Sequence, residues 1–94
     1  METKNKTYNG WINHETWVVN WWMNNEYESQ IYYGALAKKI TDPSMLADRL
    51  ASEFKNQAPE LDGVYSDLLR AAISDIFWYE IAEGLIDANG SYRE

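Results

Sequence analysis

Residues 8–22 read YNGWINHETWVVNWW and hold four of the five tryptophans of this 94-residue chain. Asn13 has the short acceptor side chain that caps helices, so a helix is expected to begin directly after it. The large apolar residues beyond it fall on one stripe of that helix, formed by Trp17, Val18, Trp21 and Trp22. We therefore expect a first helix over about residues 14–25, with Trp17 and Trp21 in the core.

The segments that follow keep a helical period between sparse Gly and Pro residues. A second helix is expected over about residues 28–40. Asp42 followed by Pro43 predicts the start of a third helix, because proline at the first helical position gives up no needed N–H and aspartate can accept from the free backbone donors. The third helix is expected to reach about residue 56.

The C-terminal half predicts further helical structure with a break at residues 77–78. Apolar residues at helical spacing run from Tyr65 to Ile76, and Leu61 in the preceding turn is expected to anchor in the core. The predicted fold is therefore all-α, a compact single-domain bundle of four to five helices in which residues 1–12 form an extended N-terminal arm.

The composition bounds the class of protein. Hydrophobic residues make up 46% of the chain, enough for one core, and 94 residues leave no room for a second. The chain has no cysteine, which excludes a disulfide framework and thiolate metal sites. Its start lacks the apolar core of a signal peptide, and no apolar run approaches the roughly 18 residues of a membrane span. We expect a cytoplasmic protein without a membrane partner.

The net charge of −7 lies entirely in residues 42–94, which carry eleven acids and four bases, whereas residues 1–41 carry four of each. Direct binding of DNA or RNA is disfavoured, because affinity for phosphate comes from clustered Lys and Arg. An acidic half instead suits a partner with a basic surface. The candidate acids are Asp62, Asp67, Asp75, Glu80, Glu83 and Asp87.

No residue pattern predicts catalysis or a cofactor. His14 is the only histidine, the serines lack the GxSxG context of hydrolases, and no Gly-rich phosphate loop is present. The helical spacing of Glu80, Glu83 and Asp87 is typical of a solvated helix face. We therefore expect neither an enzyme nor a bound metal or cofactor, and the catalytic alternative is a metal-dependent hydrolase built on helix-borne carboxylates.

Three further aromatic residues are candidates for a binding surface. Trp22, Tyr32 and Tyr33 lie on helices with more large aromatics than a domain of this size can bury, and exposed Trp and Tyr are typical anchors at interfaces. Stacking of single-stranded bases on these rings would need a positive groove, which the charge balance disfavours. A homodimer formed through the same three side chains fits equally well.

Four segments, YNGWINHETWVVNWWMNN, LADRLASEF, APELDGVYSDLLRAAIS and WYEIAEGLID, together resemble a family of short uncharacterised proteins carried by phages, plasmids and other prokaryotic mobile elements. Its members typically read YNGW, N, ETW, VN and W near the start and end with a tryptophan-led EIAE helix. The resemblance covers nearly the whole chain. It implies accessory roles such as blocking restriction or CRISPR defence.

These observations predict a non-catalytic protein-binding domain from a mobile genetic element. The hypothesis is an inhibitor of a host defence protein, of anti-CRISPR or anti-restriction type, that covers a nucleic-acid-binding surface with phosphate-like charge. Blocking by shape alone fits equally well. The alternative function is a phage or plasmid accessory module that binds nucleic acid or a replication protein.

Overall fold

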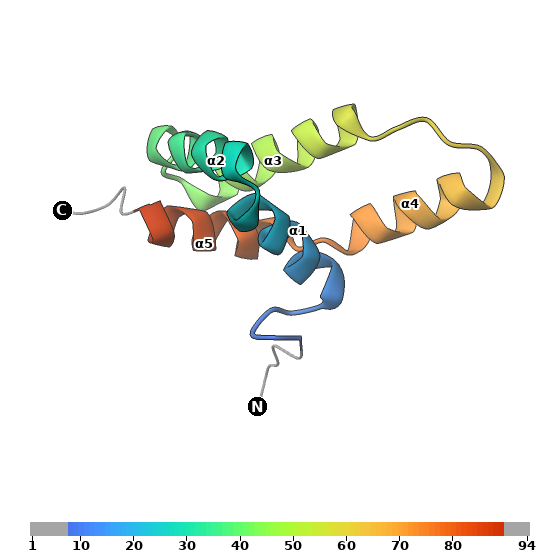
Figure 1. The fold of residues 1–94 in the computed structure, drawn as a ribbon, viewed down its shortest axis with the longest axis horizontal. Helices are drawn as coiled ribbons and strands as arrows, with labels where there is room; N and C mark the ends of the chain where they lie inside the picture. Colours follow the sequence, from blue (N-terminus) through green and yellow to red (C-terminus); the bar gives the residue numbers. More distant parts are fainter. Residues whose placement is uncertain (1–7, 90–94) are drawn as a thin grey trace.

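The computed structural model describes residues 8–89, and the chain in this range folds as a bundle of five helices (Figure 1). In chain order they are α1 (His14–Asn25), α2 (Tyr27–Lys39), α3 (Pro43–Gln57), α4 (Gly63–Asp75) and α5 (Trp78–Asn89). The described residues contain no strand beyond one isolated bridge between Tyr8 and Trp11. The predicted all-α single domain is confirmed, and so is the break before Trp78.

Two helix starts follow the capping chemistry of the sequence. The Asn13 Oδ1 accepts from the Thr16 N–H at 2.9 Å and caps α1. The Asp42 Oδ1 accepts from the Ser44 N–H at 2.9 Å and caps α3, with Pro43 at its first position. Each cap satisfies a backbone donor that has no partner inside its own helix.

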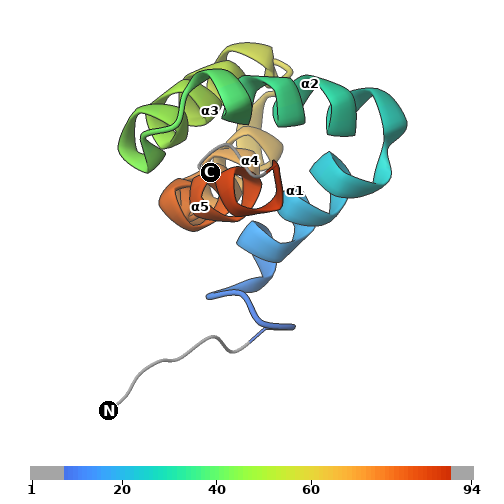
Figure 2. The same cartoon turned by 90° about the vertical axis from the view of Figure 1, so that its left-hand side faces the viewer.

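The core lies between α2, α3 and α5 and is closed by one side of α1. Figure 2 shows α5 lying under α3 and α2, so that its apolar face is covered from above. Such burial is the main stabilising term in a domain of this size. The buried hydrophobic residues are Met23, Tyr33, Leu36, Ala37, Leu46, Ala47, Leu50, Ile81, Ala82, Leu85 and Ile86.

Gly34 marks a close approach between α2 and α5. A Cβ atom at this position would lie 2.7 Å from the Asn89 Oδ1, well inside van der Waals contact. Glycine weakens a helix interior by about 1 kcal/mol relative to alanine. Here its missing side chain allows the end of α5 to pack against α2.

The start of the chain differs from the extended arm predicted for residues 1–12. Residues 1–7 lie outside the described range, and residues 8–11 form a tight turn in which Tyr8 and Trp11 exchange backbone hydrogen bonds of 2.9 and 2.7 Å. Asn9 and Gly10 have φ values of +49° and +90°. Positive φ at both central residues suits Asn-Gly, the preferred pair for two-residue hairpin turns.

Helix α1 turns its tryptophan stripe, defined as Trp17, Val18, Trp21 and Trp22, away from the core. The inward side carries Thr16 and Met23, 0% and 2% exposed, whereas Trp21 is 43% exposed. The prediction that Trp21 lies in the core was therefore wrong. Trp17 is half-buried against the rings of Tyr8 and His14 rather than in the core cluster.

Helix α4 projects beyond the core, and none of its residues is buried. Figure 1 shows α4 extending away from α5 nearly along the same line, toward the loop that joins it to α3. Leu61 in this loop is 43% exposed, so the prediction that it anchors in the core was wrong. Because α4 packs mainly on the side of α1, its outer end has no second layer to cover it.

Candidate partner-binding surface

The residues of the N-terminal motif join α1 to the corner between α4 and α5. The Asn13 Nδ2–H donates to the Asp75 carbonyl at 2.7 Å, and the Thr16 Oγ1 accepts from the Phe77 N–H at 2.9 Å. Thr16 is fully buried, so its hydroxyl replaces water as the partner of that backbone donor. We call Asn13 and Thr16 the N-terminal clamp, and their position explains why the opposite side of α1 faces outward.

Glu80 belongs to the same structural corner. It is only 7% exposed, and its Oε1 accepts from the Ile12 N–H at 3.2 Å. A buried carboxylate that accepts a backbone hydrogen bond holds the chain together instead of presenting charge to a partner. Of the predicted acidic surface residues, Glu80 therefore serves the fold.

The other predicted acids are exposed and follow the line of α4 and α5. Asp62 precedes α4, Asp67 and Asp75 lie on it, and Glu83 and Asp87 lie on α5. Figure 2, viewed along this direction, shows α5 in front of α4, so the two helices run nearly end to end. The acids are thus distributed along the molecule and do not gather in one cluster.

Local pairing reduces the acidic field at Asp67. The Asp67 Oδ1 accepts from the Arg70 Nη2 at 3.1 Å, and both side chains are highly exposed, so the pair adds little to stability. Glu83 and Asp87 border a shallow hollow with Gly10 and Trp11. A basic partner would meet acidic side chains on α5 beside an aromatic ring.

The three predicted aromatic anchors have different surroundings. The Trp22 ring is 59% exposed and meets the Trp21 ring edge to face, with the centroids 5.4 Å apart. Tyr33 is 9% exposed and stacks on Phe54 at 6.3 Å, which places it in the core. Trp22 and Tyr32 therefore reach the surface and Tyr33 does not.

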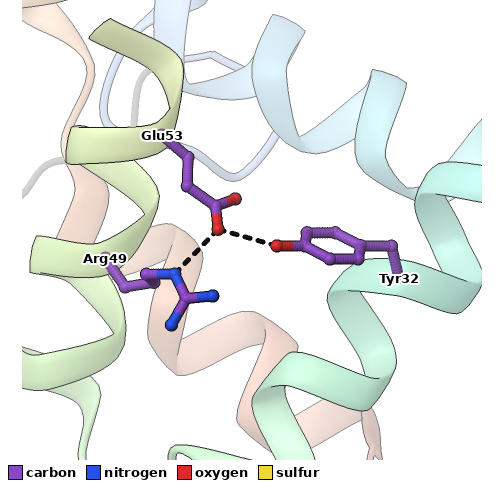
Figure 3. A network of polar contacts seen from close by, with 3 residues as sticks. All are labelled: Tyr32, Arg49 and Glu53. Carbon is purple, nitrogen blue, oxygen red and sulfur yellow. Dashed lines mark hydrogen bonds and ion pairs between the residues drawn. The ribbon is translucent and has the colours of Figure 1, made fainter. Parts of the chain in front are cut away.

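Tyr32 is held by a polar network between α2 and α3 (Figure 3). Its hydroxyl donates to the Glu53 Oε2 at 2.7 Å, and the Arg49 Nε–H donates to the same oxygen at 2.7 Å. The hydrogen bond to Glu53 raises the pKa of Tyr32 above its ordinary value, and the hydrogen bond to the same carboxylate also raises the pKa of Arg49. Tyr32 is therefore a neutral, oriented side chain that is still half exposed.

Burial and the nearby charge of Glu53 raise the pKa of Tyr33. Desolvation is the larger cause, as expected for a phenol inside the core. Ionisation of Tyr33 would place a negative charge between α2 and α3, close to a carboxylate. The neutral form of Tyr33 is therefore the form that the fold requires.

An apolar groove of about 560 Å³ opens between α1, α3 and α4. The helical spacing of the apolar residues in α4 indicates that this helix has an apolar face, but it does not predict the groove. Its apolar walls come from three helices that only the tertiary structure brings together. They include Val18, Val19, Phe54, Leu69, Ala72 and Ile73.

Residues 8–89 contain no cluster of three or more His, Asp or Glu side chains that could hold a metal ion. His14, the first residue of α1, stacks on Trp17 with a centroid separation of 5.9 Å. Of the helices in this range, none combines the length and the apolar character needed to cross a membrane.

The fold and its exposed surfaces define a small all-α domain with an outward-facing tryptophan stripe and an open apolar groove. The chain belongs to the Family of unknown function (DUF7249), whose model matches residues 4–90. Comparisons with curated proteins and with solved structures found no match. Membership of an uncharacterised family is confirmed, and the mobile-element setting stays a prediction.

Proposed function

We propose that this chain is a non-catalytic protein-binding domain that acts by covering a surface of its partner. The outward orientation of the tryptophan stripe carries the proposal. Trp21 and Trp22 are 43% and 59% exposed, whereas Met23 on the inward side of α1 is 2% exposed, so the two tryptophans contribute little to the core. Large aromatics exposed in this way lose water contact only when a partner covers them, and tryptophan is the residue most enriched at binding hot spots.

Helix α2 adds further anchors beside this stripe. It begins only two residues after α1 ends, and it exposes Tyr27, Ile31 and Tyr32. Tyr27 and Ile31 lie one turn apart on the helix surface. The hydrogen bond from Tyr32 to Glu53 fixes the direction of that ring before any partner arrives, which lowers the entropy lost on binding.

The proposed partner is a host defence protein with a basic nucleic-acid-binding surface, of the kind found in restriction or CRISPR effectors. The net charge of −7 and the line of acids along α4 and α5 support this choice. Exposed carboxylates can occupy the positions that phosphates take on such a surface. A mobile-element origin is part of the same proposal.

The test is protection of incoming DNA in cells that carry a defined restriction or CRISPR system. Expression of the chain is expected to raise survival of phage or plasmid, and Trp22→Ala should abolish the effect. Met45→Ala is the matched control, because Met45 is exposed on α3, away from the tryptophan stripe. Equal protection by all three proteins, or none by any of them against a panel of systems, would contradict the proposal.

A second measurement isolates the role of charge. Binding of the purified chain to the protected effector should compete with the effector's DNA and weaken as salt is raised. The double change Glu83→Lys and Asp87→Lys should weaken binding most strongly at low salt. Affinity that is the same at low and high salt would remove the phosphate-mimic part of the proposal.

A further inference from the structure

Helix α4 carries a single apolar stripe that the rest of the chain leaves uncovered. Residues four apart lie next to each other on a helix, so Leu68 adjoins Ala72 and Tyr65 adjoins Leu69. Tyr65 and Leu68 are 68% and 60% exposed, whereas Leu69 and Ala72 line the apolar groove. Since α4 has 13 residues and buries none of them, a partner that covers this stripe would stabilise a helix that is marginal by itself.

The walls of the groove favour a helix as its occupant. Val18 on α1, Phe54 on α3 and Ile73 on α4 lie within helices, whose backbone groups already bond to each other. These walls therefore offer no strand edge to an extended peptide. Such a peptide would also place its own N–H and C=O groups against apolar side chains without partners, which is costly. A helix satisfies its own backbone and contacts the walls through side chains alone.

The charge around the groove favours a basic helix. Of the described residues that line the groove, Glu15 is an acid and none is Lys or Arg. Arg70, the one base in residues 58–75, forms an ion pair with Asp67. Lys or Arg on the flanks of an incoming helix would therefore meet carboxylates, and Asp or Glu there would be repelled. The acids of this segment are Glu60, Asp62, Asp67 and Asp75.

We propose that the groove binds an amphipathic helix of a partner protein, with its apolar face on the stripe of α4 and Lys or Arg along its flanks. A helix of 13 residues is about 20 Å long, so a partner helix of about three to four turns can cover the whole of α4. The partner helix would provide the second layer that α4 lacks. The proposal goes beyond the defence function, because it concerns the groove and names the kind of segment that binds there.

Three synthetic peptides of about 14 residues test this proposal with the purified chain. The first has leucines at helical spacing and lysines elsewhere, and the second has glutamates in place of the lysines. The third has the composition of the first in a scrambled order without an apolar face, so it measures attraction by charge alone. In fluorescence anisotropy, the first peptide is expected to bind with a dissociation constant at least about tenfold lower than either of the others.

Two adjacent alanines of α4 provide a matched pair of variants. Ala72 lines the groove, so Ala72→Gln places a longer polar side chain in it without changing the charge of the protein. This variant should raise the dissociation constant of the lysine-bearing helix at least about tenfold. Ala71 is exposed and does not line the groove, so Ala71→Gln should bind like the wild type. Circular dichroism should show the same helix content in both variants, because glutamine is a good helix former.

Hydrogen exchange locates the contact, since the amides of α4 should exchange more slowly when the lysine-bearing helix is bound. The proposal is overturned if that peptide does not bind, or if the scrambled or glutamate-bearing peptide binds equally well. Unchanged affinity in Ala72→Gln, or unchanged exchange in α4, overturns it as well. The peptide assay contains no defence protein, so its outcome does not depend on the outcome of the protection test.

Discussion

Helices α4 and α5 follow each other along the molecule and have 13 and 12 residues, yet they have opposite environments (Figure 1). Both place apolar residues at helical spacing. Helix α5 buries Glu80, Ile81, Ala82, Leu85 and Ile86, whereas α4 buries nothing. An amphipathic pattern specifies that one face of a helix requires cover. It does not specify whether that cover comes from the same chain or from another molecule.

The difference arises from the neighbours of each helix. Helix α5 lies against both α2 and α3 and enters the core along its whole length. Helix α4 is attached near its C-terminal end, where the Asn13 side chain reaches the Asp75 carbonyl. The distant end of α4 follows a loop that carries Leu61 into solvent. The clamp therefore fixes where α4 ends and leaves its apolar face open.

The largest expected effect compares one residue from each helix. Ile81→Ala on α5 should lower the free energy of unfolding by about 2–5 kcal/mol, because Ile81 is fully buried and its loss leaves a cavity. Leu68→Ala on α4 should change it by no more than about 0.5 kcal/mol. Urea unfolding at concentrations where the chain is monomeric measures both. Similar losses for the two variants would show that α4 is packed as tightly as α5.

An intermediate effect is expected where the clamp joins the two regions. Thr16→Val keeps the shape of the buried side chain and removes the acceptor of the Phe77 N–H, which should cost about 1–3 kcal/mol. Thr41→Val, at an exposed position in the loop before α3, is the control and should be nearly neutral.

Hydrogen exchange locates the loss in Thr16→Val. The Phe77 amide and the amides of α4 should exchange faster, while those of α5 change less, because α5 keeps its packing against α2 and α3. Unchanged exchange at Phe77 would mean that the hydroxyl of Thr16 does not protect this amide.

The smallest effect concerns pH and tests the core that covers α5. The pKa of Tyr33 is raised in the folded protein, chiefly by burial, so the folded state holds this proton more tightly than the unfolded state. The contribution of Tyr33 to the free energy of unfolding should therefore not change with pH below the ordinary pKa of 10.0. It should fall as the pH rises above that value. Unfolding measured from neutral to alkaline pH should show a shallower decline in Tyr33→Phe than in the wild type. The same slope in both proteins would assign the alkaline loss to other groups.

Much of the fold followed from local chemistry. Asn13 and Asp42 correctly predicted two helix starts, because their side chains cap helices. The sequence also predicted the break near Trp78. The candidate surface was harder to predict. Trp22 and Tyr32 are exposed as anchors should be, whereas Tyr33 and Glu80 are buried. Residue type and helical spacing could not separate the exposed residues from the buried ones. Tyr32 and Tyr33, for example, are adjacent tyrosines on the same helix, but only Tyr33 is buried.

Sequence by itself determined that this chain is an all-α domain whose helices each have an apolar face to bury, because capping and hydrophobic spacing act within a few residues. Tertiary structure alone decided which face of each helix is covered. On α1 the hydrogen bond between Thr16 and Phe77 turns Thr16 inward and the tryptophan stripe outward. On α4 the absence of a second layer at its outer end leaves the groove open. Both outcomes depend on contacts between residues far apart in the chain, whose geometry no local pattern encodes.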